Sequence, residues 1–396
     1  MVRRQRRNGV NAVKAVVNGN LVLEREIVSG QVLLYEGDTI RDIMGQRFFC
    51  PRMCEEVIDA TGCFVTAGFI NEHIHGCGGA DAMDEADHAL ETMAALLPQT
   101  GVTAFLPTTM TYERSRIEAA LTRIRTARRK KPQGARILGA HMEGPFINEQ
   151  YKGAQEAAAI AKADISLIED YGDIIKIITL APETIDDKTF FALCRDKDIV
   201  VSVGHSAATY EEMAGMADCG VYHVTHLFNA MPAFHHRQPG LIGAALTDDR
   251  AHCELICDNI HVHRTAQVLA YKAKGRDGLI LITDSLRACL MGDGLFELGG
   301  REVLVRDGRA RLADGTLAGS IVTMDRAVFN FLVNTGAPLP DVIAMATINP
   351  ARDLGVAERL GSLEKGKQAD ITFLDDGDLH VRRTIVAGET VYMETP

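Results

Sequence analysis

Short apolar runs alternate with polar or alanine-rich stretches of helical length through the central two-thirds of this 396-residue chain. Each run is rich in Val and Ile and ends in a polar or glycine-rich tip. Apolar strands that alternate with helices indicate a parallel sheet covered on both faces, and eight of them over about 220 residues predict an α/β fold, a closed (β/α)8 or TIM barrel. A doubly wound open sheet is the competing architecture. The eight runs cover residues 63–75, 102–110, 135–146, 174–183, 198–207, 221–231, 252–262 and 278–286.

Two flanking segments have a different pattern. Residues 13–65 and 356–396 alternate apolar and polar positions between glycine turns, which is typical of half-buried antiparallel strands. Flanks that are distant in the sequence can pair with each other. We therefore expect one small β-sandwich domain formed by both flanks, beside a barrel domain of residues 66–355.

Polar side chains follow the predicted strands at the points where the strands end. His73 and His75 stand one residue apart, and because side chains alternate along a strand, both imidazoles face the same side. Strand ends converge on one mouth in a barrel, whereas an open sheet would spread them apart. We therefore expect one shared site for His73, His75, Glu143, His205, His226, His261 and Asp284.

This combination of residue types is suited to a divalent metal ion. Imidazole and carboxylate groups together favour Zn²⁺ or Fe²⁺. An ion with an open coordination position lowers the pKa of bound water from 15.7 to about 7. A carboxylate must then take the proton and return it to a leaving group, and Asp284 in "LITDSL" is the candidate. Taken alone, "TDS" fits a helix-capping Asx turn equally well.

The remaining histidines have simpler interpretations. His141, two residues before Glu143, is a candidate for a supporting role behind the metal ligands. Because side chains alternate along a strand, His223 should face the same side as Thr225 and away from His226, outside the metal site. We expect ordinary structural roles for His88, His252 and His380.

Composition and charge exclude several classes of protein. The chain has 46% hydrophobic and 24% charged residues, as ordinary globular proteins do, and no run of 18 apolar residues that would span a membrane. A net charge of −11 disfavours binding to nucleic acid or to anionic membranes. Nine cysteines without a CxxC pair indicate reduced thiols. The basic start "MVRRQRRNGVN" lacks the apolar core of an export signal, so we expect a frayed N-terminus and a cytoplasmic protein.

A series of motifs resembles a known enzyme family. In chain order the motifs are "GFINEHIHG", "HMEGPFIN", "KGAQ", "VGHSAATYEEM", "VTHLFNAM", "HHRQPG", "CDNIHVH", "ITDSL", "LAGS", "TINPARDLG" and "GSLEKGKQADI". Together they resemble the amidohydrolase superfamily and, within it, the N-acetylglucosamine-6-phosphate deacetylases, over nearly all of the chain. The resemblance implies a TIM barrel with a β-sandwich made from both termini. It also implies a homodimer that binds a phosphorylated N-acetyl amino sugar.

The same resemblance implies a reaction and its metal. The reaction is hydrolysis of the acetamide of N-acetylglucosamine 6-phosphate to acetate and glucosamine 6-phosphate. Asp284 matches the family's general acid/base, and the cofactor would be one or two ions of zinc or iron per subunit. The matching metal ligands are Glu143, His205 and His226, joined by His73 and His75 in members that hold a second ion.

The resemblance extends to substrate contacts, one or more of which would be supplied across the dimer interface. Two positions depart from the family pattern. Gln155 in "KGAQ" stands where members usually have histidine, so this side chain can donate a hydrogen bond but cannot carry positive charge, and Asn259 stands where glycine is frequent. The residues that match substrate contacts are Ala154, Gln155, Asn229, Ala230, Arg237, His261, Leu317, Ala318 and Gly319.

Three alternatives stay open from the sequence. The chain could deacetylate another N-acetyl hexosamine phosphate, such as N-acetylgalactosamine 6-phosphate. It could also hydrolyse another amide substrate of the superfamily, or bind sugar phosphates without catalysis.

Overall fold

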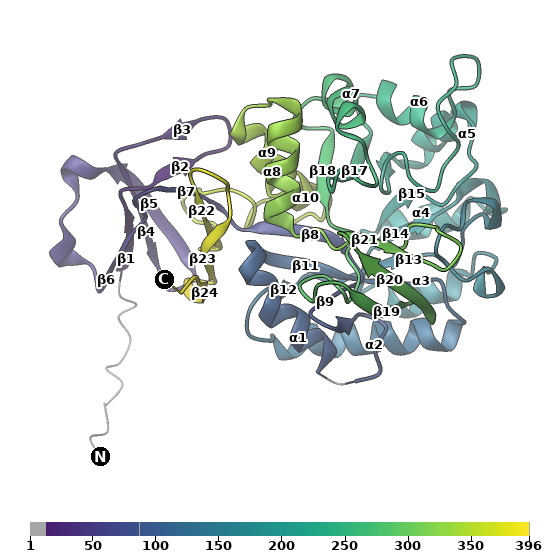
Figure 1. Cartoon of the computed structure of the whole chain (residues 1–396), viewed down its shortest axis with the longest axis horizontal. Coiled ribbons are helices and arrows are strands. Elements are labelled where there is room, and N and C mark those ends of the chain that lie inside the picture. Colours follow the sequence, from purple (N-terminus) through teal and green to yellow (C-terminus); the bar gives the residue numbers. More distant parts are fainter. Residues whose placement is uncertain (1–12, 87, 396) are drawn as a thin grey trace.

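The computed structural model describes residues 13–86 and 88–395. The prediction of a frayed N-terminus falls on residues 1–11 and lies outside this range. Figure 1 shows two units side by side, a β-sandwich that contains both ends of the described chain and a larger barrel surrounded by helices. Among the described residues, no helix combines the length and the apolar content needed to cross a bilayer.

The larger unit is the predicted TIM barrel. Its strands all pair in parallel in chain order, and β12 and β13 occupy successive parts of one strand position beside β11. Backbone hydrogen bonds from Asp284 to His73 and from His75 to Ser285, both 2.9 Å, join the last strand position to the first. The barrel is therefore closed, and the open-sheet alternative is wrong. The strands are β8 (Phe69–Ile74), β11 (Val102–Thr109), β12 (Arg136–Ile137), β13 (Ala140–Glu143), β14 (Ile175–Leu180), β15 (Val200–Val203), β16 (His223–Val224), β17 (His252–Ile256) and β18 (Leu279–Ile282).

Helices cover the outside of the barrel and bury apolar side chains against it. The longest, α2, buries Ile117, Leu121 and Ile124 against the strands, at the three-to-four-residue spacing of an amphipathic helix, and ends at Lys131 in the left-handed conformation. The helices are α1 (Ala89–Leu96), α2 (Arg114–Lys130), α3 (Ile165–Tyr171), α4 (Thr189–Asp196), α5 (Tyr210–Met216), α6 (Gly240–Thr247), α7 (Arg264–Lys274), α8 (Met324–Thr335), α9 (Leu339–Met345) and α10 (Ile348–Asp353).

The smaller unit is the predicted sandwich. One sheet has the strand order β5-β4-β1-β6 and the other β24-β23-β22-β7-β2-β3, so strands from both chain ends share the second sheet. Leu33 and Tyr35 of the first sheet share a core with Val65, Phe373 and Ile385 of the second. The strands are β1 (Val13–Val17), β2 (Asn20–Val22), β3 (Ile27–Val28), β4 (Gln31–Glu36), β5 (Thr39–Gly45), β6 (Glu56–Asp59), β7 (Cys63–Ala67), β22 (Ile371–Asp375), β23 (Val381–Val386) and β24 (Glu389–Met393).

Two small sheets were not predicted from the sequence. A two-stranded hairpin, β9 (Gly76–Cys77) and β10 (Ala80–Asp81), directly follows His75. A three-stranded antiparallel sheet, which we call the inserted sheet, lies between β18 and α8 and contains β19 (Gly294–Leu298), β20 (Arg301–Arg306) and β21 (Arg309–Arg311). In Figure 1 the green strands of the inserted sheet are drawn in front of the barrel, and the sheet contributes to the site described below.

Gly68 connects the two units. It lies between β7, in the sandwich, and β8, in the barrel, so we propose to divide the units here; the sequence-based boundary at residue 65 lies inside β7. A Cβ atom on Gly68 would lie 2.6 Å from the Cβ of Thr103 on β11, which is closer than two carbon atoms can approach. Glycine is therefore required for the first barrel strand to pack against its neighbour.

Replacing Gly68 by alanine should destabilise the protein by roughly 1–3 kcal/mol, because the added methyl group overpacks a buried contact. The midpoint of guanidinium unfolding would measure this loss. Gly215→Ala in α5 is the matched control, since a Cβ there meets nothing within 4 Å and alanine is the better helix former. A Gly68→Ala protein that unfolds at the same midpoint as wild type would contradict this account.

Candidate metal and active site

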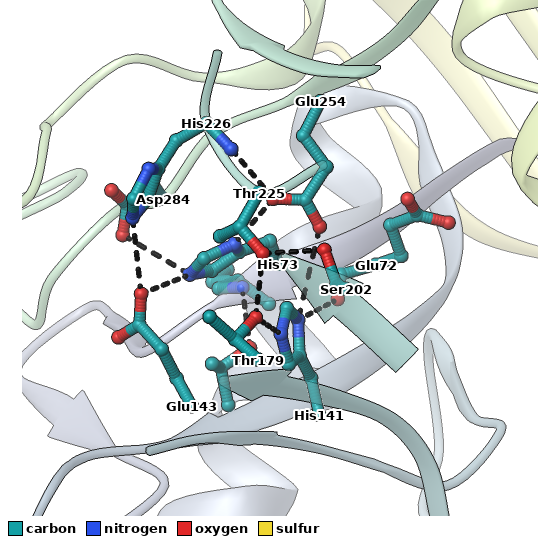
Figure 2. Close-up of polar contacts among 12 residues, drawn as sticks. Glu72, His73, His141, Glu143, Thr179, Ser202, Thr225, His226, Glu254 and Asp284 are labelled. Atoms are coloured by element: carbon teal, nitrogen blue, oxygen red, sulfur yellow. Dashed lines mark hydrogen bonds and ion pairs between the residues drawn. The ribbon is translucent and has the colours of Figure 1, made fainter. Parts of the chain in front are cut away.

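The residues proposed as metal ligands meet at the carboxyl end of the barrel. They come from strands far apart in the sequence, β8, β13, β15 and β16, and Asp284 follows β18. Figure 2 shows His73, Glu143, His226 and Asp284 directed toward one another. The cavity above them has a volume of about 410 Å3, within the usual range for small-molecule sites.

Glu143 lies at the centre of this cluster. Its Oε1 is 3.1 Å from His205 Nε2, 3.3 Å from His226 Nε2 and 3.5 Å from His73 Nε2. Its Oε2 is 3.4 Å from His75 Nε2. The carboxylate therefore belongs to two groups of potential ligand atoms, one with His205 and His226 and one with His73 and His75, each with its atoms within 4.8 Å of one another.

Hydrogen bonds on the outer side of the rings determine which nitrogen faces the cluster. His205 Nδ1 lies 2.9 Å from the carbonyl oxygen of Tyr151, and His75 Nδ1 lies 3.1 Å from that of Thr108. A carbonyl oxygen only accepts hydrogen bonds, so Nδ1 carries the proton in both rings. In the neutral rings, Nε2 is therefore left as an available ligand atom.

The facing atoms fit a bound cation. His205 Nε2, whose ring carries its proton on Nδ1, is 3.1 Å from the Glu143 carboxylate, and two acceptors this close repel one another unless a positive charge lies between them. His73 Nε2 is fully buried and has no hydrogen-bond partner within residues 13–86 and 88–395. A buried polar atom without a partner is costly. Imidazole nitrogens around a carboxylate are a donor set that zinc and iron accept.

The backbone turns sharply where these strands end. His205, His226 and Asp284 have φ angles of 48°, 32° and 47°, the left-handed region that residues other than glycine rarely adopt. Such conformations persist only where surrounding contacts enforce them, and they concentrate at functional sites. Here the turns direct the side chains that follow β15, β16 and β18 toward the cluster.

Asp284 lies beside the first histidine pair. Its Oδ1 is 3.2 Å from His75 Nε2 and 3.5 Å from His73 Nε2. Burial raises the pKa of Asp284, but when no ion is bound the protonated rings of His73 and His75 outweigh burial and lower the pKa to about 2. Asp284 is therefore a carboxylate at neutral pH, the form that can accept a proton.

Gln155 is held within the protein at both ends of its amide. The backbone N–H of Thr111 donates to Gln155 Oε1 at 2.7 Å, which leaves the NH2 group to donate to Glu143 Oε2 at 2.5 Å. The backbone N–H can only donate and the carboxylate can only accept, so the orientation of the amide is unambiguous. The side chain is buried and holds the carboxylate of Glu143 in place.

Most of the proposed substrate contacts line the cavity. Arg237 is not among its described lining residues; it is exposed and its Nη1 lies 2.8 Å from His236 Nε2. Ala318 is fully buried next to the lining. The proposed contacts that line the cavity are Ala154, Gln155, Asn229, Ala230, His261, Leu317 and Gly319.

Sequence reasoning missed several lining residues. Leu298 and Arg311 come from the inserted sheet, and Met110 follows β11. The alternation in "REVLVR" and "RARL" and the turn dipeptides "GG" and "DG" before each could have indicated these hairpins. The other missed lining residues are Gly153, Gly315 and Thr316.

Asn259, the second departure from the family pattern, has a φ of 65°. Asparagine adopts this left-handed conformation more readily than most residues. Its side-chain oxygen accepts hydrogen bonds from Gln267 and Asn334, which supports the loop from the outside.

Beneath the cluster, polar side chains fill the barrel interior (Figure 2). His141 Nε2 lies 2.7 Å from Thr179 Oγ1, and its ring lies 4.4 Å from that of His73. Burial and the charge of His73 lower the pKa of His141 to about 3, so this ring is neutral. His141 thus lies behind the proposed metal ligands, the position predicted from the sequence.

His223, His252 and His380 also lie outside the cluster, as predicted. His223 Nδ1 and Thr225 Oγ1 both contact Ser202 Oγ, at 2.8 and 2.5 Å, so His223 and Thr225 share a side and His226 faces away. Partners away from the cluster are found for His252, with Asp353, and for His380, with Asp378.

A TIM barrel whose mouth gathers imidazole and carboxylate groups is an arrangement expected of a metal-dependent hydrolase. The sequence pattern of the amidohydrolase family matches residues 64–391, and the chain belongs to this family. N-acetylglucosamine-6-phosphate deacetylase of Bacillus subtilis is 38% identical over 380 residues, which cover 94% of this chain and 96% of the relative. N-acetylgalactosamine-6-phosphate deacetylase of Escherichia coli O157:H7 is 38% identical over 325 residues, covering 81% and 86%.

A solved structure agrees with these relatives. The crystal structure of N-acetylglucosamine-6-phosphate deacetylase from Pasteurella multocida superposes with a TM-score of 0.90 at 33% identity, over 96% of this chain and 99% of that one. The family inferred from the sequence motifs and the predicted fold are both confirmed.

Proposed function

We propose that the protein hydrolyses the acetamide of N-acetylglucosamine 6-phosphate to acetate and glucosamine 6-phosphate. The observation that carries this proposal is the convergence of Glu143, His205, His226 and Asp284 at one cavity in the barrel mouth. Relatives that match nearly the whole chain are deacetylases of this substrate by name.

The proposed cofactor is zinc or iron. Glu143, His205 and His226 would hold one ion, and His73 with His75 would hold a second beside Glu143 and Asp284. Such an ion, when bound, polarises an amide carbonyl and makes water acidic enough to act as a nucleophile near neutral pH.

Asp284 would act first as general base and then as general acid in this reaction. As a carboxylate, it accepts a proton from the attacking water while the new C–O bond forms. It then returns the proton to the nitrogen while the C–N bond breaks, so that glucosamine 6-phosphate leaves as an amine. Acetate carries the oxygen that came from water.

The outer part of the cavity would bind the sugar and its phosphate. Burial alone lowers the pKa of His261, but the hydrogen bond from His261 Nδ1 to Asp258, 2.6 Å long, raises it above its ordinary value. This favours a positively charged ring that suits a phosphate group. The backbone around Asn229 and Ala230 and the turn at Leu317 to Gly319 would enclose the sugar.

The test of the function is acetate release from a panel of substrates by protein of known metal content. We expect N-acetylglucosamine 6-phosphate to have the highest kcat/KM. N-acetylgalactosamine 6-phosphate is the competing substrate, because a relative named as its deacetylase is also 38% identical, over 81% of this chain against 94%. Preference for the galacto sugar would change the substrate assignment. Binding of sugar phosphates by metal-loaded protein without acetate release would instead favour a non-catalytic homologue.

Asp284→Asn should lower kcat by about 10²- to 10⁴-fold, the usual contribution of a general acid/base. The amide fills the same space but cannot accept the proton. Circular dichroism and elemental analysis would check that the fold and the ion beside His205 and His226 remain. Turnover at the wild-type rate would remove Asp284 from its proposed role.

We also propose a homodimer, because Arg237 does not line the cavity of its own chain. Arg237 lies on an exposed loop with Phe234, whose side chain is 58% exposed, and exposed apolar residues beside charged ones are common at interfaces. In a dimer this loop can extend to the cavity of the other subunit. The guanidinium group would there bind the phosphate with two parallel hydrogen bonds.

Coexpression of Arg237→Ala and Asp284→Asn subunits should restore activity if each site uses Arg237 from the other subunit. Random pairing would make half of the dimers hybrids, each with one intact site, and recover about a quarter of wild-type activity. The two variants purified separately and assayed as a sum are the control. Activity no higher than that sum would place Arg237 in its own subunit's site or outside catalysis.

A cytoplasmic location is also part of the proposal. All nine cysteines lie in the described range and none forms a disulfide, as expected in a reducing compartment.

A further inference from the structure

A second carboxylate, that of Glu254, lies inside the barrel below the proposed metal ligands. Glu254 lies on β17 and is the only acidic residue in the strand sequence "HCELI". Its side chain is fully buried. A buried carboxylate is costly unless specific hydrogen bonds stabilise it, so its partners indicate what it does.

One oxygen of this carboxylate contacts two of the proposed ligands. Glu254 Oε2 lies 2.8 Å from His73 Nδ1 and accepts a hydrogen bond of 3.1 Å from the backbone N–H of His226 (Figure 2). His73 is on β8 and His226 directly follows β16, so the contact joins two separate strands. The backbone carbonyl of Glu254 also accepts a hydrogen bond from the backbone N–H of Leu227, the residue after His226.

The contact with His73 determines the state of that ring. A carboxylate that is ionised only accepts, so Nδ1 of His73 carries the proton. Nε2 then points toward Glu143 Oε1 and Asp284 Oδ1, each 3.5 Å away, without a hydrogen-bond partner in the described chain. A ligand histidine whose other nitrogen donates to a carboxylate is the arrangement that orients the ring and makes it a better donor to a metal.

The contact with His226 acts on the backbone. His226 has a φ of 32°, and its ring faces Glu143 only because the chain turns at this residue. A buried hydrogen bond from its N–H to a charged acceptor stabilises this conformation.

From these contacts we propose that Glu254 is a positioning residue that fixes His73 as a ligand through Nε2 and holds the turn that directs His226 toward the same centre. Glu254 itself does not touch the substrate. The inference rests on the proposed cation site, which it extends by naming the group that sets its geometry.

Glu72 offers a comparison within the same barrel interior. It is also fully buried, but its Oε1 lies 3.1 Å from His223 Nε2, on the side away from Glu143. Both carboxylates are paired with a histidine, but only Glu254 is paired with a proposed ligand. Glu72→Gln therefore serves as a control for replacing a buried acidic side chain that contacts no proposed ligand.

The experiment measures divalent-ion binding rather than turnover. Metal-free wild type, Glu254→Gln, His73→Ala and the double variant are titrated with Co²⁺ and Zn²⁺, followed by visible absorption and chelator competition, with stoichiometry from elemental analysis. We expect Glu254→Gln to weaken binding of at least one ion by roughly 10- to 100-fold, the usual effect of losing such a support. Glu72→Gln should bind both ions as wild type does.

The double variant tests whether Glu254 acts through His73. If it does, Glu254→Gln should weaken ion binding much less in the His73→Ala background than in wild type. The remaining loss of affinity would be the effect that Glu254 has through His226. Fully additive losses, or wild-type affinity in Glu254→Gln, would overturn the inference while leaving the proposed function intact. Failure of wild-type protein to bind either ion would instead overturn the proposed cation site and the inference with it.

A measurement on unaltered protein covers the case in which Glu254→Gln does not fold. Nitrogen-15 NMR of histidine-labelled, zinc-loaded protein should show His73 with a protonated Nδ1 and a zinc-bound Nε2, with the signal assigned by its absence in His73→Ala. A zinc-bound Nδ1, or a ring that exchanges between tautomers, would contradict the inference.

Discussion

The concentration of charge around Glu143 is the constraint on which the rest of the structure depends. One buried carboxylate lies within 3.5 Å of four imidazole nitrogens, from His73, His75, His205 and His226. Removing so many polar groups from water is costly, and the cost is recovered only if each group has an oppositely charged or hydrogen-bonded neighbour. Several features bring these neighbours to Glu143 and hold them there. They are the closed barrel, the tight turns after β15, β16 and β18, and the amide of Gln155.

The need of each buried polar group for a hydrogen-bonded or charged partner also explains why the barrel interior is polar. Barrels of this type are usually filled with layers of Val, Ile and Leu. Here Thr179, Ser202 and Thr225 form a chain of hydrogen bonds that continues to His141. These hydroxyls give partners to one ring nitrogen of His141 and one of His223, and the ring of His141 packs against that of His73, a proposed ligand.

The strands and the site were predictable from the sequence for a physical reason. Periodic apolar runs reflect strands that are buried on both faces, and the polar residues at their ends must meet once the barrel closes. The alternation rule also separated His223 from His226 correctly. The apolar runs and the polar residues at their ends are each visible in a short stretch of sequence. The single assumption that the strands close into a barrel brings those residues together.

Other parts depend on contacts that no local pattern records. The amide of Gln155 and the backbone of Thr111 are 44 residues apart, and Glu254 and His73 are 181 residues apart. Which partner each group selects is decided by the final packing. The lone acid in the apolar strand β17 was a signal that could have identified Glu254, but not its role.

The inserted sheet has a consequence for how such a protein can change over time. Its strands pair only with one another among the sheets of the described chain, and its side chains share a small core with Met110, Leu286 and Ala318. Leu298 and Arg311 extend from it into the cavity, while every proposed cation ligand lies on the barrel. Part of the cavity wall therefore lies outside the barrel, so this part can diverge without any change to the proposed ligands or to the barrel loops that carry Asn229 and His261.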